Sequence, residues 1–116
     1  MKIKTSELKG AALDWAVGQA HRDADLVPVA YSTDWAFGGL IIEREKIGVW
    51  WAHHVVDDEG NEYGNHWYAE TGLTDDSADE RHVCMTGETP LIAAMRCYVA
   101  SKLGDEVEVP DELKGE

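Results

Sequence analysis

The sequence predicts a small α+β domain that has an antiparallel sheet and two main helices. Three observations predict it: a helical pattern near each end of the chain, two strand-like runs rich in valine and aromatic residues between them, and a polar turn that joins those runs. The 116 residues are enough for one domain with its own core. We therefore expect a single domain over residues 1–116, in which residues 111–116 form a frayed acidic tail.

The first twenty residues predict a strand followed by a helix. Residues 1–5 alternate between apolar and polar side chains, as an edge strand does. The helix is expected to end near His21, because apolar residues before it recur at helical spacing and form one face. The residues of that face are Leu8, Ala12, Trp15, Ala16 and Ala20, and we expect Trp15 to lie in the core.

The middle of the chain predicts a loop and then a hairpin. Residues 31–39 show no period and contain two adjacent glycines, which is typical of a long structured loop. A short helical turn over residues 41–46 leads to a strand over residues 47–56, which is rich in valine and tryptophan. The sequence "DDEGNEYGN" then turns the chain, and "HWYAET" returns as the partner strand.

The C-terminal third contains the clearest helix, which we predict over residues 90–103. Thr89 is a good N-cap, Pro90 suits the first helical position, and Gly104 is placed for a left-handed C-cap. The apolar residues of this helix that recur at three- and four-residue spacing should face the core on one side; they are Leu91, Ala94, Met95 and Tyr98.

The segments on either side of this helix are less regular. Before it, residues 72–87, "GLTDDSADERHVCMTG", predict a mobile loop, because they combine a glycine with a run of acidic and small polar residues. After it, residues 106–110, "EVEVP", predict a last short strand.

Charge is the first unusual feature of the composition. The chain has 23 acidic and 10 basic residues and a formal net charge of −13, so it repels phosphate backbones at long range. This argues against direct binding of DNA or RNA. The acidic residues gather in residues 57–59, 75–80 and 105–116, and such runs are usually solvated surface. The alternative is an acidic face that imitates nucleic acid and occupies a basic groove on another protein.

Targeting and redox signals are also informative. The first ten residues lack the apolar run of a signal peptide, and no stretch approaches the length needed to span a bilayer, so we expect a soluble intracellular protein without a membrane partner. The cysteines, Cys84 and Cys97, form neither a CxxC pair nor a paired framework. We expect two free thiols.

Five histidines raise the question of a metal. His53, His54, His66, His82 and Cys84 have suitable donor atoms, but their spacing does not match a ligand frame such as HExxH, and neighbouring strand residues point to opposite faces. We therefore expect no metal. Because GxGxxG and GxxxxGK[ST] frames are absent as well, we expect no cofactor and no enzymatic activity.

Aromatic residues are the second unusual feature. Five tryptophans and four tyrosines exceed what a core of this size needs, so some of the rings should be exposed. Exposed rings are typical of protein interfaces and of sites for flat ligands such as nucleobases. They also favour a homo-oligomer.

The best candidate for a binding site is the predicted loop "YSTDWAFGG". Its hydroxyls, the Asp34 carboxylate, the Trp35 ring and the open backbone of its glycines are groups that a nucleotide requires. The alternative is an ordinary turn that Asp34 begins and in which Trp35 fills the core. We expect the start of the 90–103 helix to form a second wall, because its free N–H groups and dipole favour an anion. The predicted ligand-binding residues are Tyr31, Thr33, Asp34, Trp35, Gly38, Gly39, Thr89 and Arg96.

The sequence leaves two roles open for Arg96. It lies near the middle of the predicted helix, where it either faces a bound phosphate or pairs with an acidic neighbour. Pairing is the more common outcome in so acidic a chain.

Three blocks of the sequence resemble a known family. "MKIKTSELKGAALDWAV", "YSTDWAFGGLIIEREKI" and "GETPLIAAMRCYVASKLGDEVEVP" are similar to the NinX-like family of small phage proteins, whose function is unknown. The family usually has proline where Leu40 stands here. The resemblance does not include the hairpin or the segment "LTDDSADERHVCM". It implies a phage accessory protein that acts in the cytoplasm of the infected bacterial host.

Two functions remain open on this basis. The first is a sponge that sequesters a nucleotide-type immune signal of the host, which the Trp35 loop and the helix start favour. The alternative is an acidic inhibitor, or nucleic-acid mimic, that blocks a basic host protein, which the net charge of −13 favours. The expected partners are therefore a nucleotide-type small molecule or a host protein.

Overall fold

The computed structural model describes residues 2–20, 30–71 and 83–111. The expected acidic tail and the acidic run at 75–80 therefore lie outside the described residues, apart from Asp111 at the edge of the tail. The described elements follow in the order β1 (Lys2–Lys4), a 3₁₀ turn (Thr5–Glu7), α1 (Gly10–Ala20), α2 (Trp35–Glu45), β2 (Gly48–Ala52), β3 (Val55–Val56), β4 (Glu62–Tyr63), β5 (His66–Thr71), β6 (Val83–Gly87), α3 (Pro90–Leu103) and β7 (Glu106–Glu108). This confirms the α+β class.

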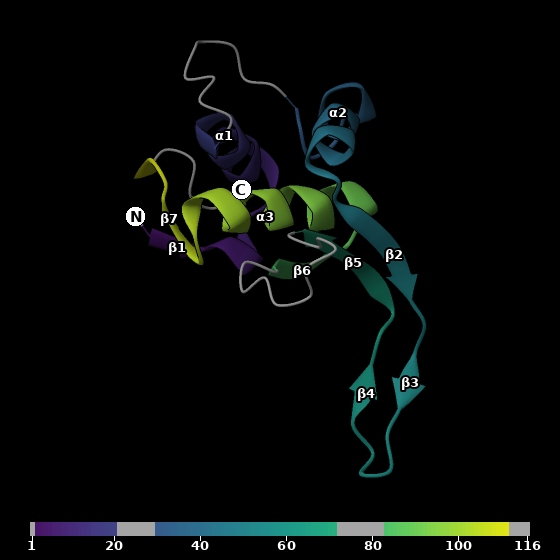
Figure 1. Cartoon of the computed structure of the whole chain (residues 1–116). Coiled ribbons are helices and arrows are strands. Elements are labelled where there is room, and N and C mark those ends of the chain that lie inside the picture. The colour runs from purple at the N-terminus through teal and green to yellow at the C-terminus, as the bar shows by residue number, and fades with distance from the viewer. Residues whose placement is uncertain (1, 21–29, 72–82, 112–116) are drawn as a thin grey trace.

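The central helix is α3, which packs against both other helices and the three-stranded sheet. α1 and α2 lie on one side of it, and strands β5 and β6 lie on the other (Figure 1). Eight residues of α3 are buried, so the helix is enclosed on more than the one face that the spacing predicts. Leu13, Val17, Met95 and Val99 are among the largest fully buried side chains of the core.

The helix α2 is the main difference from the sequence prediction. Residues 35–39 belong to a helix that runs from Trp35 to Glu45, and only residues 31–34 remain as a turn before it. Two adjacent glycines weaken an isolated helix, which is why the sequence favoured a loop. Packing overrides that preference here, because Gly38 lies against the Tyr31 carbonyl and the Leu91 side chain, where a larger residue does not fit.

The three-stranded sheet has the order β2–β5–β6, and both pairs are antiparallel. The predicted pairing of the hairpin is confirmed, with Trp50 opposite Tyr68 and Trp51 opposite Trp67, but the strand predicted over residues 47–56 is divided into β2 and β3, and β4 lies within the segment predicted as the turn. The third strand, β6, falls where the sequence predicted a loop up to residue 87. Its five residues pair with β5 and pack against α3, so tertiary contacts supply the order that its sequence does not indicate.

Two smaller pairs complete the fold. β1 pairs with β7 in antiparallel register, which confirms the predicted edge strand and last strand; Ile3 and Val107 form the inward pair. β3 and β4 form a two-stranded ribbon that continues from β2 and β5 and extends away from the helices (Figure 1). This ribbon gives the molecule its long axis, with extents of 49 × 34 × 25 Å.

None of the helices that the structure describes is both long enough and apolar enough to cross a bilayer.

Candidate functional site

The start of α2 brings several of the predicted site residues together. Asp34 is the N-cap: its Oδ1 accepts a hydrogen bond from the Ala36 N–H at 2.9 Å. Trp35 is the first residue of the helix, and 56% of its surface is exposed, so it does not fill the core as the alternative interpretation required. Thr33 is exposed in the preceding turn. The structure therefore places an open indole ring at a capped helix start.

Gly38 and Gly39 act differently from one another. A Cβ atom at Gly38 would lie within 2.6 Å of Leu91 Cδ1 and closer still to the Tyr31 carbonyl oxygen, so Gly38 permits a tight approach between α2 and α3. Gly39 lies beside the indole of Trp35: a Cβ atom at Gly39 would lie 3.5 Å from Trp35 Cε3. Tyr31 itself is buried. Gly38 and Tyr31 thus hold the segment in place rather than offering a surface.

The start of α3 agrees with the sequence prediction. Thr89 is its N-cap, and the Thr89 hydroxyl oxygen accepts a hydrogen bond from the Ile92 N–H at 3.0 Å, with Pro90 in the first turn. At the other end, Gly104 has the predicted positive φ of 92°, although its ψ of −167° differs from the left-handed helical value.

The two helix starts lie on the same side of the α2–α3 interface. Gly38 contacts Leu91 near both starts, and Arg44 bonds Tyr98 one to two turns further along both helices. Because the contacts follow the same order along both helices, the two helices have the same direction along their interface. The structure thus brings the predicted 31–39 segment next to the first turn of α3, which the sequence was not able to establish.

Arg96 donates hydrogen bonds to two backbone carbonyls, contacts that the sequence did not predict. Its Nε donates to the Leu8 carbonyl at 2.7 Å, and its Nη1 donates to the Thr86 carbonyl at 2.9 Å. Burial lowers the pKa of Arg96, and the nearby Glu88 opposes that effect. The side chain therefore ties the N-terminal segment and β6 to α3.

One buried hydroxyl near the start of α2 has no partner among the described residues. Ser32 is only 2% exposed, and its Oγ makes no hydrogen bond, whereas its backbone N–H donates to Asp14 Oδ1 at 2.8 Å. Buried polar atoms are normally paired, so this atom is a candidate ligand contact.

An apolar surface on α2 was not predicted from the sequence. Trp35 is joined by Phe37, which is 46% exposed, and Leu40, which is 65% exposed. We call these three residues the α2 surface. Phe37 and Leu40, three residues apart, are neighbours on the helix, whereas Trp35, two residues before Phe37, lies on a different side of its first turn. Sequence patterning missed them because residues 35–39 were assigned to a loop, where helical spacing is not considered.

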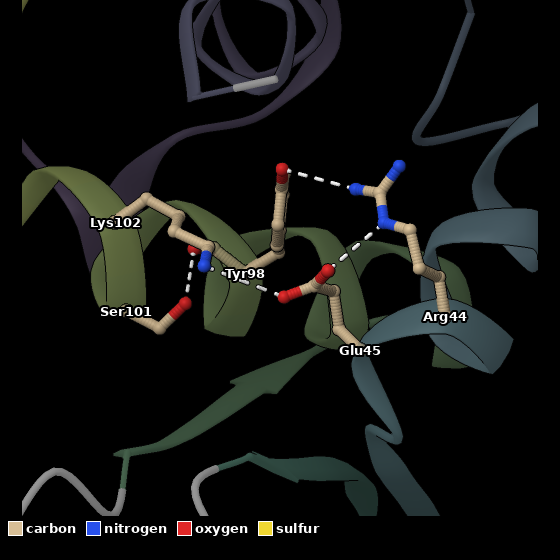
Figure 2. Close-up of polar contacts among 5 residues, drawn as sticks. All are labelled: Arg44, Glu45, Tyr98, Ser101 and Lys102. Carbon is tan, nitrogen blue, oxygen red and sulfur yellow. Dashed lines mark hydrogen bonds and ion pairs between the residues drawn. The ribbon is translucent and has the colours of Figure 1, made fainter.

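The far ends of α2 and α3 are joined by a polar cluster (Figure 2). Arg44 donates from Nη2 to the Tyr98 hydroxyl at 3.2 Å and from Nε to Glu45 Oε2 at 2.9 Å, while Lys102 Nζ lies 3.5 Å from Glu45 Oε1. The hydrogen bond from Arg44 lowers the pKa of Glu45, and burial raises the pKa of Tyr98. These contacts hold α2 against α3 and leave the α2 surface outward.

The thiols and histidines do not form a reactive centre in the described part of the chain. Neither Cys84 nor Cys97 forms a disulfide; burial raises the pKa of Cys97 to about 12, and it also raises the pKa of Cys84. His54 Nε2 lies 2.9 Å from Glu62 Oε1, and His66 lies against the Tyr68 ring. Among the described residues no group of three or more histidine, cysteine and carboxylate side chains is placed to hold a metal, and His82 lies outside those residues.

The chain matches the model of a known family. The family model described as "Bacteriophage P22, NinX" matches residues 28–102, which include α2, the three-stranded sheet, the ribbon and most of α3. The match includes the hairpin that the three resembling blocks left out, and it ends before β7. No curated protein matches the chain.

Proposed function

This chain belongs to the NinX family of phage proteins, and on that premise we propose that it is a binding module that blocks a basic protein of the infected bacterium. The family membership makes it a phage protein and assigns no reaction. Neither thiol has a lowered pKa, and no metal-ligand group is present among the described residues, so the proposal rests on binding.

The observation that carries the proposal is the α2 surface. Trp35, Phe37 and Leu40 are three large apolar side chains on an eleven-residue helix that buries only Gly38 and Ile41. Phe37 and Leu40 lie together, and adjacent exposed apolar groups mark interaction sites; Trp35, at the start of the same helix, adds a residue type that contributes strongly to binding energy. The ordered helix presents them without a further conformational change, which reduces the entropy cost of binding.

The net charge supports a basic partner. A chain of net charge −13 attracts a positively charged protein over distances of about a Debye length, which raises the association rate. Around the α2 surface itself, Asp34 and Glu43 are exposed. Electrostatic attraction would therefore bring the partner in, and the apolar contacts would hold it.

The proposal is tested by capture from a lysate of the host bacterium. We expect the immobilised protein to retain a basic protein, identified by mass spectrometry, and the double variant Trp35→Ala, Leu40→Ala to lose it about tenfold or more, since a contact of this kind contributes about 2 kcal/mol. Retention should also weaken between about 0.1 M and 1 M salt, because the Debye length falls from about 10 Å to about 3 Å.

A matched control is available on the ribbon. Val56 is 54% exposed, close to the 56% of Trp35, but it lies in β3 of the ribbon, far from α2 (Figure 1). Val56→Ala should retain the captured protein as the wild type does. Equal retention by the double variant, or a complex insensitive to salt, would contradict the proposal.

A nucleotide-type ligand is the second candidate, and one specific observation favours it. Gly38 lets the capped starts of α2 and α3 lie side by side, next to the exposed Trp35 ring and near the Ser32 hydroxyl, which has no partner among the described residues. Two helix starts together favour an anion more than one does, and an indole stacks on a base. It ranks second because the Asp34 and Thr89 side chains are engaged as caps and Arg96 is engaged with two carbonyls.

This candidate has its own test, the thermal unfolding of the protein against cyclic, linear and ADP-ribose-type nucleotides. A ligand present at about 100 times its dissociation constant stabilises the fold by about 2.7 kcal/mol, which raises the unfolding midpoint by several degrees. Trp35→Ala should remove that shift while leaving the unliganded midpoint in place. A panel in which no nucleotide shifts the midpoint would reject the sponge hypothesis for these ligand classes.

A further inference from the structure

The strand β2 forms one edge of the three-stranded sheet, and it carries no charge. Its sequence is GVWWA, and it pairs only with β5 in the part of the chain that the structure describes. Soluble proteins usually protect such edges with charged residues, proline or bulges, because alternate N–H and C=O groups of an edge strand remain available for pairing. An unprotected edge in a chain of net charge −13 therefore needs a reason.

The two-stranded sheet of β1 and β7 shows the usual protection of its edges by charged residues. The outward residues of β1 and β7 are all charged: Lys2 lies opposite Glu108, and Lys4 lies opposite Glu106. In β2 the corresponding exposed positions are taken by Trp50 and Trp51, which are 40% and 42% exposed. The two edges thus differ in the feature that discourages strand addition.

The two tryptophans extend the aromatic surface of the sheet to its edge. Trp50 stacks on Tyr68 with ring centroids 5.7 Å apart, and Trp51 meets Trp67 edge to face at 5.5 Å. Because neighbouring strand residues point to opposite faces, each face of the sheet has one aromatic pair that ends at β2. A further strand beside β2 would continue both rows.

We propose that β2 pairs with β2 of a second copy of this chain, antiparallel and across a two-fold axis at Trp50. The two sheets then join into one sheet with the order β6–β5–β2–β2–β5–β6. In this register Trp50 lies opposite Trp50 of the other copy, Val49 lies opposite Trp51, and Gly48 lies opposite Ala52.

A second copy fits this edge better than an unrelated strand for two reasons. A strand paired antiparallel with itself forms a closed two-fold contact, in which each copy uses the same surface and no free β2 edge remains to recruit further chains. The contact also places no like charges together, although both copies are strongly acidic, because β2 contains none. On one face, the Trp50 rings of the two copies complete a row between the two Tyr68 rings.

The first experiment measures the mass of the whole chain in solution by light scattering. The wild type should have about twice 12.9 kDa at protein concentrations of about 100 µM, and its mass should fall on dilution. Trp50→Lys places a charge at the edge and should weaken the dimer about tenfold or more. The matched control, Val56→Lys, adds the same charge to the ribbon, outside β2, and should remain dimeric.

The second experiment tests the register by disulfide trapping, because Trp50→Lys also removes the stack on Tyr68. In a Cys84→Ser background, chains with Trp50→Cys should cross-link to each other on oxidation, since opposed Cα atoms lie about 4.5 to 5.5 Å apart. Chains with Gly48→Cys should not cross-link alone, because four residues separate the two copies of position 48 by about 13 Å. Mixed with Ala52→Cys chains, they should cross-link.

Each outcome decides the inference. A monomeric wild type, a dimer that Trp50→Lys leaves intact, or Gly48→Cys chains that cross-link alone would overturn it. Because none of these substitutions touches α2, a failure here leaves the proposed binding function in place.

Discussion

The helices α3 and α2 start in the same way but differ in how many of their residues are buried. Each begins at a polar N-cap whose side chain accepts a backbone N–H, Thr89 for α3 and Asp34 for α2. Beyond those caps, α3 buries eight of its fourteen residues, whereas α2 buries two of eleven and exposes three large apolar side chains. The difference teaches that α3 organises the core, whereas α2, held against it, leaves large apolar side chains exposed.

The contacts of α2 with α3 near both of its ends explain this difference in burial. Gly38 lets α2 approach Leu91 closely at one end, and Arg44 and Glu45 join Tyr98 and Lys102 at the other. A helix fixed at both ends by few residues can present the rest of its surface outward. This is why α2 keeps its shape without burying Trp35, Phe37 and Leu40.

The largest effect that the comparison predicts is in the centre of α3. Met95 is 0% exposed and belongs to the core cluster, so Met95→Ala removes buried apolar contacts and leaves a cavity. The free energy of unfolding should fall by about 2 to 5 kcal/mol, measured by urea denaturation.

The same helix offers the control for that measurement. Leu103, in the last turn of α3, is 39% exposed, and Leu103→Ala should cost much less than Met95→Ala. A similar loss at both positions would show that α3 is not the core of the fold, and the division between the two helices would fail.

The sequence was sufficient for α3, and the reason is physical. Its limits follow from local chemistry that acts within a few residues: a threonine cap, a proline in the first turn and a glycine after the last turn. The hairpin pairing of β2 and β5 was equally predictable, because β-rich runs flank a turn segment with two glycines. The β1–β7 pair followed from simple alternation.

The sequence was not sufficient for α2 and β6, whose order depends on distant contacts. Two adjacent glycines in α2 predict a loop until the close approach of Gly38 to Leu91 is known. β6 becomes a strand because β5 and α3 lie on either side of it, and its own sequence contains Gly87 at its end. Local propensity was correct in neither case, since tertiary packing decided both.

The candidate site was predictable only in part for a related reason. Residue types correctly indicated Thr89 as a cap, but they left open whether the Trp35 ring is exposed or fills the core, and the structure shows it exposed. They did not indicate that Arg96 bonds the Leu8 and Thr86 carbonyls, because those partners are 88 and 10 residues away in the chain. Phe37 and Leu40 were missed because their exposure depends on which side of α2 meets α3.

The smallest effect that the comparison predicts is also its most direct test: the free energy of unfolding of the double variant Trp35→Ala, Leu40→Ala. If the α2 surface serves binding and not folding, this free energy should stay within about 0.5 kcal/mol of the wild type, although the variant loses its captured partner. A decrease of about 2 kcal/mol or more, in the range of Met95→Ala, would mean that these side chains stabilise the fold, and it would contradict the account.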